Sequence, residues 1–158
     1  MQAEKEFMNK AIEVAKDSAK RGDYALGAVI VKENKIIATG TTNLKHENDP
    51  TVHAEIVAIR NACKSVGSKF LNDCILYTTH EPCPMCASAA IWARMEGIVF
   101  GASLEDALEY AKSKATRKFT WRQINIKCKD ILLKGDPKLE LIEKFMREDC
   151  NKLFELSS

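Results

Sequence analysis

Two short motifs bring together residue types that can bind a metal ion and move protons. In the first, Cys83 and Cys86 stand three residues apart, with a proline on each side of Cys83. The second is His53-Ala54-Glu55. Cysteine thiolates and a neutral imidazole are good zinc ligands, and a set of three leaves the fourth position open for water. His53, Cys83 and Cys86 therefore suit a catalytic zinc site better than a closed structural one.

The spacing of the two cysteines predicts that a helix begins beside them. Three residues cover nearly one helical turn, so both sulfurs then lie on one face. The N-terminus of a helix carries a partial positive charge and free N–H groups, which favour thiolates. Pro84 suits the first turn, because its missing N–H would have no partner within the helix.

Glu55 is the candidate for proton transfer beside a bound water molecule. Its separation from His53 places it about 200° round a regular helix, away from the imidazole. Glu55 can reach the water only if the first helical turn is irregular or if the cleft wraps that end of the helix. The spacing alone leaves this open.

The same residues allow three other interpretations. The two cysteines can form a redox pair, or a structural zinc site can take a fourth ligand from His80, Cys74 or Cys128. Glu55 can be a plain carboxylate that the helix dipole favours. However, His-x-Glu together with Pro-Cys-x-x-Cys is the signature of zinc-dependent deaminases, and this joint pattern favours catalysis.

The elements that must position these residues follow from the hydrophobic pattern. Apolar residues at helical spacing predict helices over 2–20, 52–65, 84–94, 104–118 and 138–155. Short apolar runs predict strands over 25–31, 36–40, 74–79, 97–101 and 123–128, of which the first two form a hairpin. Strands that alternate with helices after an opening hairpin predict an α/β sandwich with a mixed sheet.

Length and composition exclude several classes of protein. The chain has 158 residues, of which 46% are hydrophobic and 29% charged, so we expect one globular domain over 1–158. No apolar run is long enough to span a membrane, and residues 1–6 do not resemble the start of a secretory signal. Six cysteines without a need for a disulfide framework favour the reducing cytoplasm. A net charge of +2 does not by itself indicate a nucleic-acid partner.

The stretch 48–56, which contains His53-Ala54-Glu55, and the stretch 77–102 resemble the zinc-dependent deaminases of the cytidine deaminase superfamily. Within it, they resemble the branch of guanine deaminases and tRNA adenosine deaminases. The resemblance implies a three-layer α/β/α sandwich with a five-stranded mixed sheet, zinc on His53, Cys83 and Cys86, and Glu55 as the proton shuttle. It further implies backbone N–H donors near Ala54 and Cys83, loss of ammonia from an amine-bearing ring, and a homodimer.

The substrate is suggested by fewer residues. Trp92-Ala93-Arg94 resembles guanine deaminases, in which a tryptophan here packs on the base, although Trp92 can also be a core or interface aromatic. The family asparagine of the loop after the second strand aligns with Thr42, and the neighbouring Asn43 takes its place if the loop is one residue shorter. We therefore expect deamination of guanine to xanthine. A tRNA adenosine deaminase, a cytosine or cytidine deaminase, and a non-catalytic zinc-stabilised module are the alternatives.

A basic stretch over 112–129 bears on this choice. It holds seven lysines and arginines and no acidic residue, interleaved with Phe119 and Trp121. Such a stretch can be a solvated face, or it can bind a nucleotide phosphate or tRNA. Against tRNA, Ser103 to Ala107 replace the pattern usual in the tRNA enzymes. Near the C-terminus, Phe154 can close the pocket or belong to the core.

Overall fold

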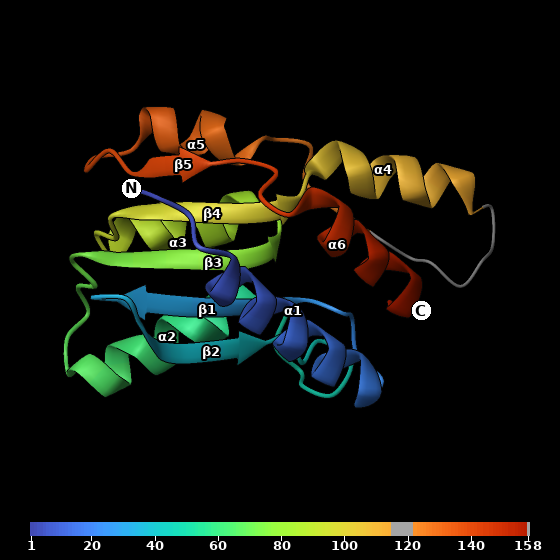
Figure 1. Ribbon diagram of the computed structural model, residues 1–158, viewed down its shortest axis with the longest axis horizontal. Coiled ribbons are helices and arrows are strands. Elements are labelled where there is room, and N and C mark those ends of the chain that lie inside the picture. Colours follow the sequence, from blue (N-terminus) through green and yellow to red (C-terminus); the bar gives the residue numbers. More distant parts are fainter. Residues whose placement is uncertain (115–121, 158) are drawn as a thin grey trace.

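The computed structural model describes residues 1–114 and 122–157. In chain order the elements are α1 (Lys5–Lys20), β1 (Gly27–Lys32), β2 (Lys35–Thr41), α2 (Ala54–Val66), β3 (Cys74–His80), α3 (Pro84–Trp92), β4 (Gly97–Ala102), α4 (Leu104–Ser113), α5 (Cys128–Lys134), β5 (Glu140–Ile142), α6 (Arg147–Asn151) and a 3-10 helix (Lys152–Leu156). Figure 1 shows how they are arranged.

The strands form one sheet with the order β2-β1-β3-β4-β5. β1 pairs antiparallel with β2 and with β3, whereas β3, β4 and β5 are parallel to one another. The hairpin of β1 and β2 thus lies at one edge, and β3, which leads to the first metal-ligand cysteine, lies in the centre. In the described part of the chain, no helix has the length and apolar character needed to cross a membrane.

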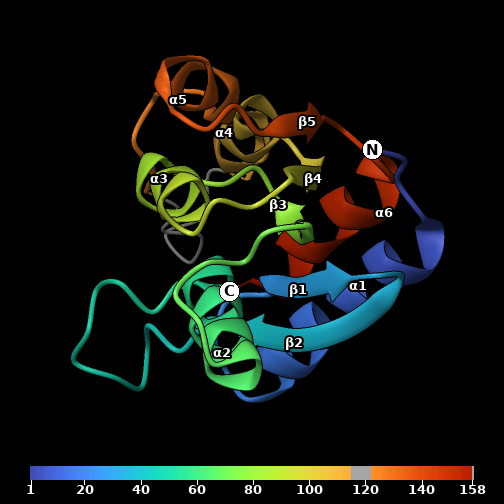
Figure 2. The same ribbon diagram turned by 90° about the vertical axis from the view of Figure 1, so that its left-hand side faces the viewer.

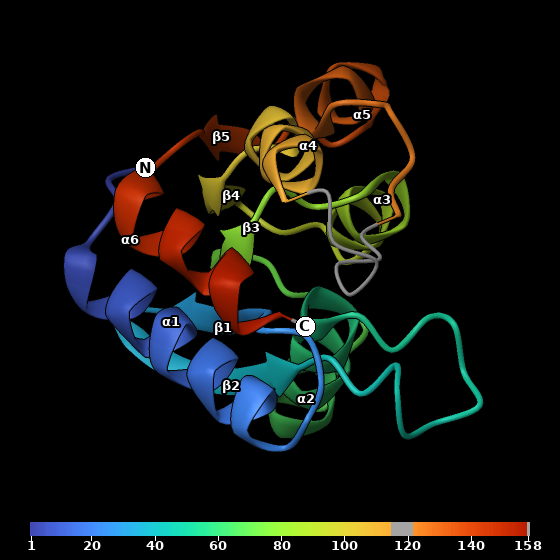
Figure 3. The same cartoon turned by 90° about the vertical axis from the view of Figure 1, so that its right-hand side faces the viewer.

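Helices cover both faces of the sheet, as Figures 2 and 3 show. On one face, α2, α3 and α5 pack over a core that includes Ile30, Leu76 and Ile98. On the other face, α1, α6 and the 3-10 helix pack over a second core that includes Tyr77 and Val99. The predicted three-layer α/β/α sandwich with a five-stranded mixed sheet is therefore confirmed.

Two glycines allow the helices to approach the hairpin closely. A Cβ at Gly40 would lie 2.9 Å from Cα of Ala58, with the carbonyl oxygen of Ala54 closer still, both in α2. A Cβ at Gly27 would lie 2.6 Å from the backbone nitrogen of Ala15 in α1, on the opposite face. Real Cβ atoms essentially never approach within 3.0 Å, so only glycine fits at these positions.

The predicted strand over 123–128 is wrong. Residues 123–127 form no strand, and α5 begins at Cys128. Ile124 and Ile126, whose alternation suggested a strand, are 56% and 44% exposed and line a cavity described below. The fifth strand is instead β5, which pairs with β4 through Gly97 opposite Glu140.

The predicted helix over 138–155 is wrong in its first half for a related reason. That segment supplies β5, and the backbone then turns through positive φ at Lys144 and Met146, at 58° and 53°. Only the remainder is helical, as α6 and the 3-10 helix. Of the predicted helix over 104–118, residues 104–113 form α4, and residues 115–118 lie outside the described part.

The cysteines outside the motif and Phe154 belong mainly to the interior. Cys74, Cys128 and Cys150 are buried, Cys63 is half-buried, and all six cysteines of the chain are free thiols. Phe154 is 5% exposed and stacks on Tyr110 with ring centroids 5.4 Å apart. Of its two predicted roles, the structure favours the core.

Candidate active site

The first turns of α2 and α3 position the two motifs. His53 is the residue before α2, with φ −76° and ψ 152°, and Cys83 is the residue before α3, with φ −65° and ψ 168°. Both residues are therefore extended and occupy the N-cap position of a helix. Pro84 occupies the first turn of α3, as predicted. The positive ends of two helix dipoles favour negative charge on the thiolates here.

The three predicted ligands come together although His53 lies 30 residues before Cys83 in sequence. Nδ1 of His53 is 3.6 Å from Sγ of Cys83 and 3.7 Å from Sγ of Cys86, and the three ligand atoms lie within 4.8 Å of one another. Ligands at about 2.0–2.3 Å from a tetrahedral zinc ion are about 3.6 Å apart, so this set fits zinc. Among the described residues, no fourth side chain joins the set. An open, catalytic type of site is thereby favoured.

The hydrogen bonds among Cys83, Cys86 and His53 shift the pKa values of all three side chains. The hydrogen bond from Cys86, followed by that to His53, lowers the pKa of Cys83 to about 4. The same contact and burial raise the pKa of Cys86, and the bond to Cys83 raises the pKa of His53. These shifts favour a thiolate at Cys83 and a protonated thiol at Cys86 in the metal-free site. A divalent cation would bind both sulfurs as thiolates, so its binding would release the proton of Cys86.

Glu55 does face the ligands. Its Oε2 accepts a hydrogen bond from the thiol of Cys86 at 3.5 Å, and its Oε1 accepts one from the hydroxyl of Thr78 at 3.3 Å. The angle of a regular helix does not apply, because His53 is extended and only Glu55 lies within α2. Glu55 is 7% exposed, and burial raises the pKa of its carboxyl group although His53 opposes this.

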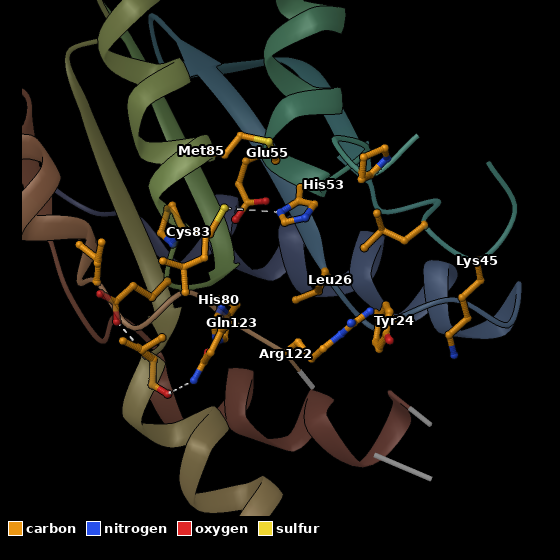
Figure 4. Close-up of a pocket in the computed structure, with 17 residues that line it drawn as sticks. Tyr24, Leu26, Lys45, His53, Glu55, His80, Cys83, Met85, Arg122 and Gln123 are labelled. Atoms are coloured by element: carbon orange, nitrogen blue, oxygen red, sulfur yellow. Dashed lines mark hydrogen bonds between the residues drawn. The ribbon is translucent and has the colours of Figure 1, made fainter. Parts of the chain in front are cut away.

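A cavity of about 750 Å³ opens above these side chains. His53, Glu55 and Cys83 line one part of it, and Figure 4 shows them turned toward one another. Tyr24 and Arg122 line another part, where the side chain of Arg122 extends toward Tyr24. Arg122 was suggested by the basic stretch. Tyr24 and Thr78 were not found from the sequence, since nothing in their spacing marks them.

This geometry agrees with comparisons to known proteins. The family model for the cytidine and deoxycytidylate deaminase zinc-binding region matches residues 1–102, which include all three ligands. The chain belongs to this family. Membership makes it a zinc-dependent hydrolase of the deaminase class, and His53, Cys83 and Cys86 are placed to hold the zinc.

The relatives of this deaminase fall into two groups. It is 48% identical to guanine deaminase of Bacillus subtilis over 104 residues, 65% of this chain and 67% of that protein. It is 41% identical to the tRNA-specific adenosine deaminase of Aquifex aeolicus over 96 residues, 61% of this chain and 64% of the relative. The matches thus span about two thirds of the relatives' lengths.

Solved structures give the same two groups. The X-ray structure of the Bacillus subtilis guanine deaminase aligns with a TM-score of 0.65 and 39% identity, over 79% of this chain and 87% of the other. A structure from studies of A-to-I editing by tRNA:A34 deaminases aligns with a TM-score of 0.72 and 27% identity, over 95% and 99%. The fold beyond residue 102 is therefore also shared with solved deaminases.

The predicted substrate residues of this deaminase lie in different places. The side-chain amide of Asn43 donates to Oε1 of Glu47 at 2.5 Å, within its own loop. Thr42, the other candidate in that loop, is buried. Ala54 is the first residue of α2, where a backbone N–H has no partner within the helix. Among the described residues, those that line the cavity include none of these three. Their contact with a substrate stays a prediction.

Trp92 lies on the outside of α3. Its side chain is 82% exposed and borders a second hollow of the surface, together with Phe70 and Arg94. The interpretation of Trp92 as a core residue is therefore wrong. It also does not line the cavity of its own chain in the described structure, because it is the last residue of α3 whereas Cys83 and Cys86 lie at the start.

Proposed function

We propose that this protein deaminates an aminopurine base or nucleoside hydrolytically, with guanine converted to xanthine and ammonia released. The observation that carries the proposal is the buried carboxylate of Glu55, turned toward three zinc-type ligands at the wall of a cavity of about 750 Å³. A cavity of this size accommodates a purine. Guanine is favoured by the 48% identity to a guanine deaminase.

The geometry supports a separate role in metal binding, proton transfer or positioning for each of these residues. His53, Cys83 and Cys86 would hold the zinc ion, which would lower the pKa of a bound water molecule toward neutrality. Glu55 would take up a proton from the attacking water and pass it to the departing amine. Burial raises the pKa of its carboxyl group, which suits a group that must both gain and lose a proton. The hydroxyl of Thr78, which also lies 3.2 Å from the carbonyl oxygen of His80, can donate to this carboxylate.

The direct test is ammonia release from guanine, guanosine, adenine, cytosine and cytidine. We expect turnover of guanine, and no turnover of any purine would reject the proposal. Glu55→Gln should abolish deamination while zinc stays near one ion per chain, because the amide cannot shuttle the proton. Zinc binding without activity on any of these substrates would favour a non-catalytic zinc-stabilised module instead.

A tRNA adenosine deaminase is the second candidate, because two cationic residues line the same cavity. Lys45 and Arg122 come from different segments and lie beside Tyr24, an arrangement that suits phosphate groups and an unpaired base. Of the basic stretch, residues 115–121 lie outside the described part. Reversal of charge at Lys112, Lys114 and Arg122 should weaken tRNA binding at low salt if tRNA is the substrate. Unchanged binding would exclude it.

We also propose a homodimer that uses the face around Trp92. Trp92 on α3 and Leu133 on α5 are 82% and 71% exposed, and α3 and α5 pack side by side. Large exposed apolar side chains on adjoining helices are typical of an interface, and a second copy could receive Trp92 near its substrate. Trp92→Ser should shift the protein to monomer in sedimentation. An unchanged mass would place the interface elsewhere.

We also propose a cytoplasmic location and a single folded domain. The six free thiols are consistent with a reducing, cytoplasmic location. A single domain over 1–158 is supported by β5, which joins the C-terminal segment to the same sheet as β1 to β4. Limited proteolysis that yields no stable fragment shorter than the chain is the expected result.

A further inference from the structure

Glu81, two residues before the ligand Cys83, is a buried acid with an unusual set of partners. It is 7% exposed. Its Oε2 accepts the backbone N–H of Leu104 at 2.8 Å, and its Oε1 accepts the backbone N–H of Cys128 at 2.9 Å. Both oxygens therefore serve as acceptors of backbone N–H groups, an arrangement that suits a carboxylate.

The two donors are the first residues of α4 and α5, so Glu81 ties together the starts of two helices that are 24 residues apart in sequence. A third bond strengthens the junction, because the side-chain amide of Gln123 donates to the carbonyl oxygen of Leu104 at 3.2 Å. Glu81 thus fixes the end of the segment 122–127 against the loop that carries the metal ligand Cys83.

That segment forms a wall of the substrate cavity. Arg122, Gln123, Ile124 and Ile126 all line it, together with Glu81 itself. Both isoleucines are substantially exposed, so little hydrophobic burial holds this wall in place. Residues 123–127 lie in no strand or helix, although the carbonyl oxygen of Lys127 accepts the N–H of Asp130 in α5. Lys127 also forms an ion pair with Glu105 in α4, but in the described structure it is the junction at Glu81 that connects the wall to the loop of Cys83.

We propose that Glu81 is a positioning residue that sets the distance between this wall and the metal centre and so determines how tightly the substrate base is bound. The proposal rests on the deaminase function proposed above. Glu81 acts through the backbone of Leu104 and Cys128, which already use both of its oxygens, and it takes no part in proton transfer.

The test compares Glu81→Gln with Asp106→Asn. The amide of the first variant keeps the shape of the side chain but must turn an N–H group toward one of the two N–H donors. Asp106 is a matched control, because it is also a buried acid that accepts a backbone N–H of the same turn, that of Ser103 at 2.9 Å. Its other partner, however, is Arg147, outside the cavity wall.

We expect Glu81→Gln to raise KM for guanine roughly 10-fold or more, the loss typical of a hydrogen bond to a charged group. The value of kcat should change little, and zinc should stay at one ion per chain, because binding rather than chemistry is affected. Asp106→Asn should lower Tm without this rise in KM. Equal rises of KM in both variants, or loss of zinc from Glu81→Gln, would overturn the proposal.

A second pair of variants approaches the same bond from its donor. Cys128→Pro removes the N–H, and Cys128→Ala removes only the sulfur. Proline suits the first position of α5, and Lys127 before it already has φ −72° and ψ 144°, which proline requires of its predecessor. Cys128→Pro should reproduce the rise in KM, whereas Cys128→Ala should not. A wild-type KM in Cys128→Pro would count against the proposal.

Hydrogen exchange separates this proposal from the proposed function. In Glu81→Gln, amides of residues 122–128 should exchange roughly 10-fold faster than in the wild type, and amides of α1 should be unchanged. This measurement needs no substrate. If the wild type deaminates no purine but exchange accelerates as expected, the function is wrong and the anchoring role stands. Unchanged exchange would reject the role of Glu81 whatever the activity.

Discussion

Substitution of Gly40 in β2 by alanine should displace α2 and so disturb the active site. An added Cβ at this position would lie 2.9 Å from Cα of Ala58, whereas ordinary contact begins near 3.4 Å. The first turn of α2 must therefore move away by at least about 0.5 Å, and by more at the carbonyl oxygen of Ala54, which lies closer. This turn carries Glu55 and follows His53 directly.

The variant should lose both thermal stability and catalytic rate, for different reasons. Overpacking of this sort typically costs about 1–3 kcal/mol, which lowers Tm by roughly 2–12 °C in a chain of this size. Catalytic groups must be held within about 0.5 Å of the productive geometry, and a displacement of about 1 Å can cost 100-fold in rate. We therefore expect kcat of Gly40→Ala to fall roughly 10–100-fold and its zinc to be lost to a chelator more readily.

Gly27→Ala is the matched control. Its Cβ would lie 2.6 Å from the backbone nitrogen of Ala15, so the packing conflict is similar, but the displaced helix is α1, which carries no metal ligand. The assay measures Tm, zinc retention against a chelator and ammonia release for both variants. Similar losses of Tm with a large loss of activity only in Gly40→Ala are expected. Equal activities at equal Tm would refute the view that close packing of α2 sets the geometry of the site.

Three shorter predictions test other parts of the molecule. Burial raises the pKa of Asp106, but hydrogen bonds from Arg147 and Ser103 outweigh it and lower the pKa from 3.8 to about 2. This pair therefore stabilises the fold by up to about 2 kcal/mol above pH 4 and loses that contribution as the pH falls toward 2, so urea unfolding of wild type and Asp106→Asn should differ at pH 6 and converge at pH 2. Removal of zinc by a chelator should lower Tm, and added zinc should restore it, because the ion binds the folded chain. Thr78→Val should lower kcat roughly 3- to 10-fold by freeing the Glu55 carboxylate, with zinc content unchanged, as measured by ammonia release under saturating guanine.

The metal site could be predicted from sequence because its residues are identified by chemistry. Cys83, Cys86 and His53 have few other uses at this spacing, and helix starts place them without further information. The direction of Glu55 could not be predicted in the same way. It depends on the extended backbone of His53, because His53 and Glu55 are then not separated by the angle of a regular helix and can face the same site.

The segment 123–128 shows why the substrate side is harder. Ile124 and Ile126 alternate with polar residues, which is the pattern of a half-buried strand. In the structure the same alternation directs apolar side chains toward a cavity, where a substrate rather than a second sheet face would cover them. A pattern of hydrophobicity shows which side chains are apolar, but not whether protein or ligand will contact them.

Residues up to 102 and residues beyond 102 also differ in how well the hydrophobic pattern predicts their structure. Up to residue 102, periodic apolar residues place the strands and helices, and this is the part that the family model matches. Beyond it, Ala107 of α4 and Leu132 of α5 still pack in the cores, but the starts of both helices are fixed by polar contacts. These are the capping box of Ser103 and Asp106, the pair Asp106–Arg147, and the two bonds of Glu81. Such contacts have no period in the sequence and can be exchanged without disturbing the sheet. A wall fixed in this way can vary while the metal centre stays the same, which is consistent with relatives that share the zinc-binding region but act on guanine or on tRNA.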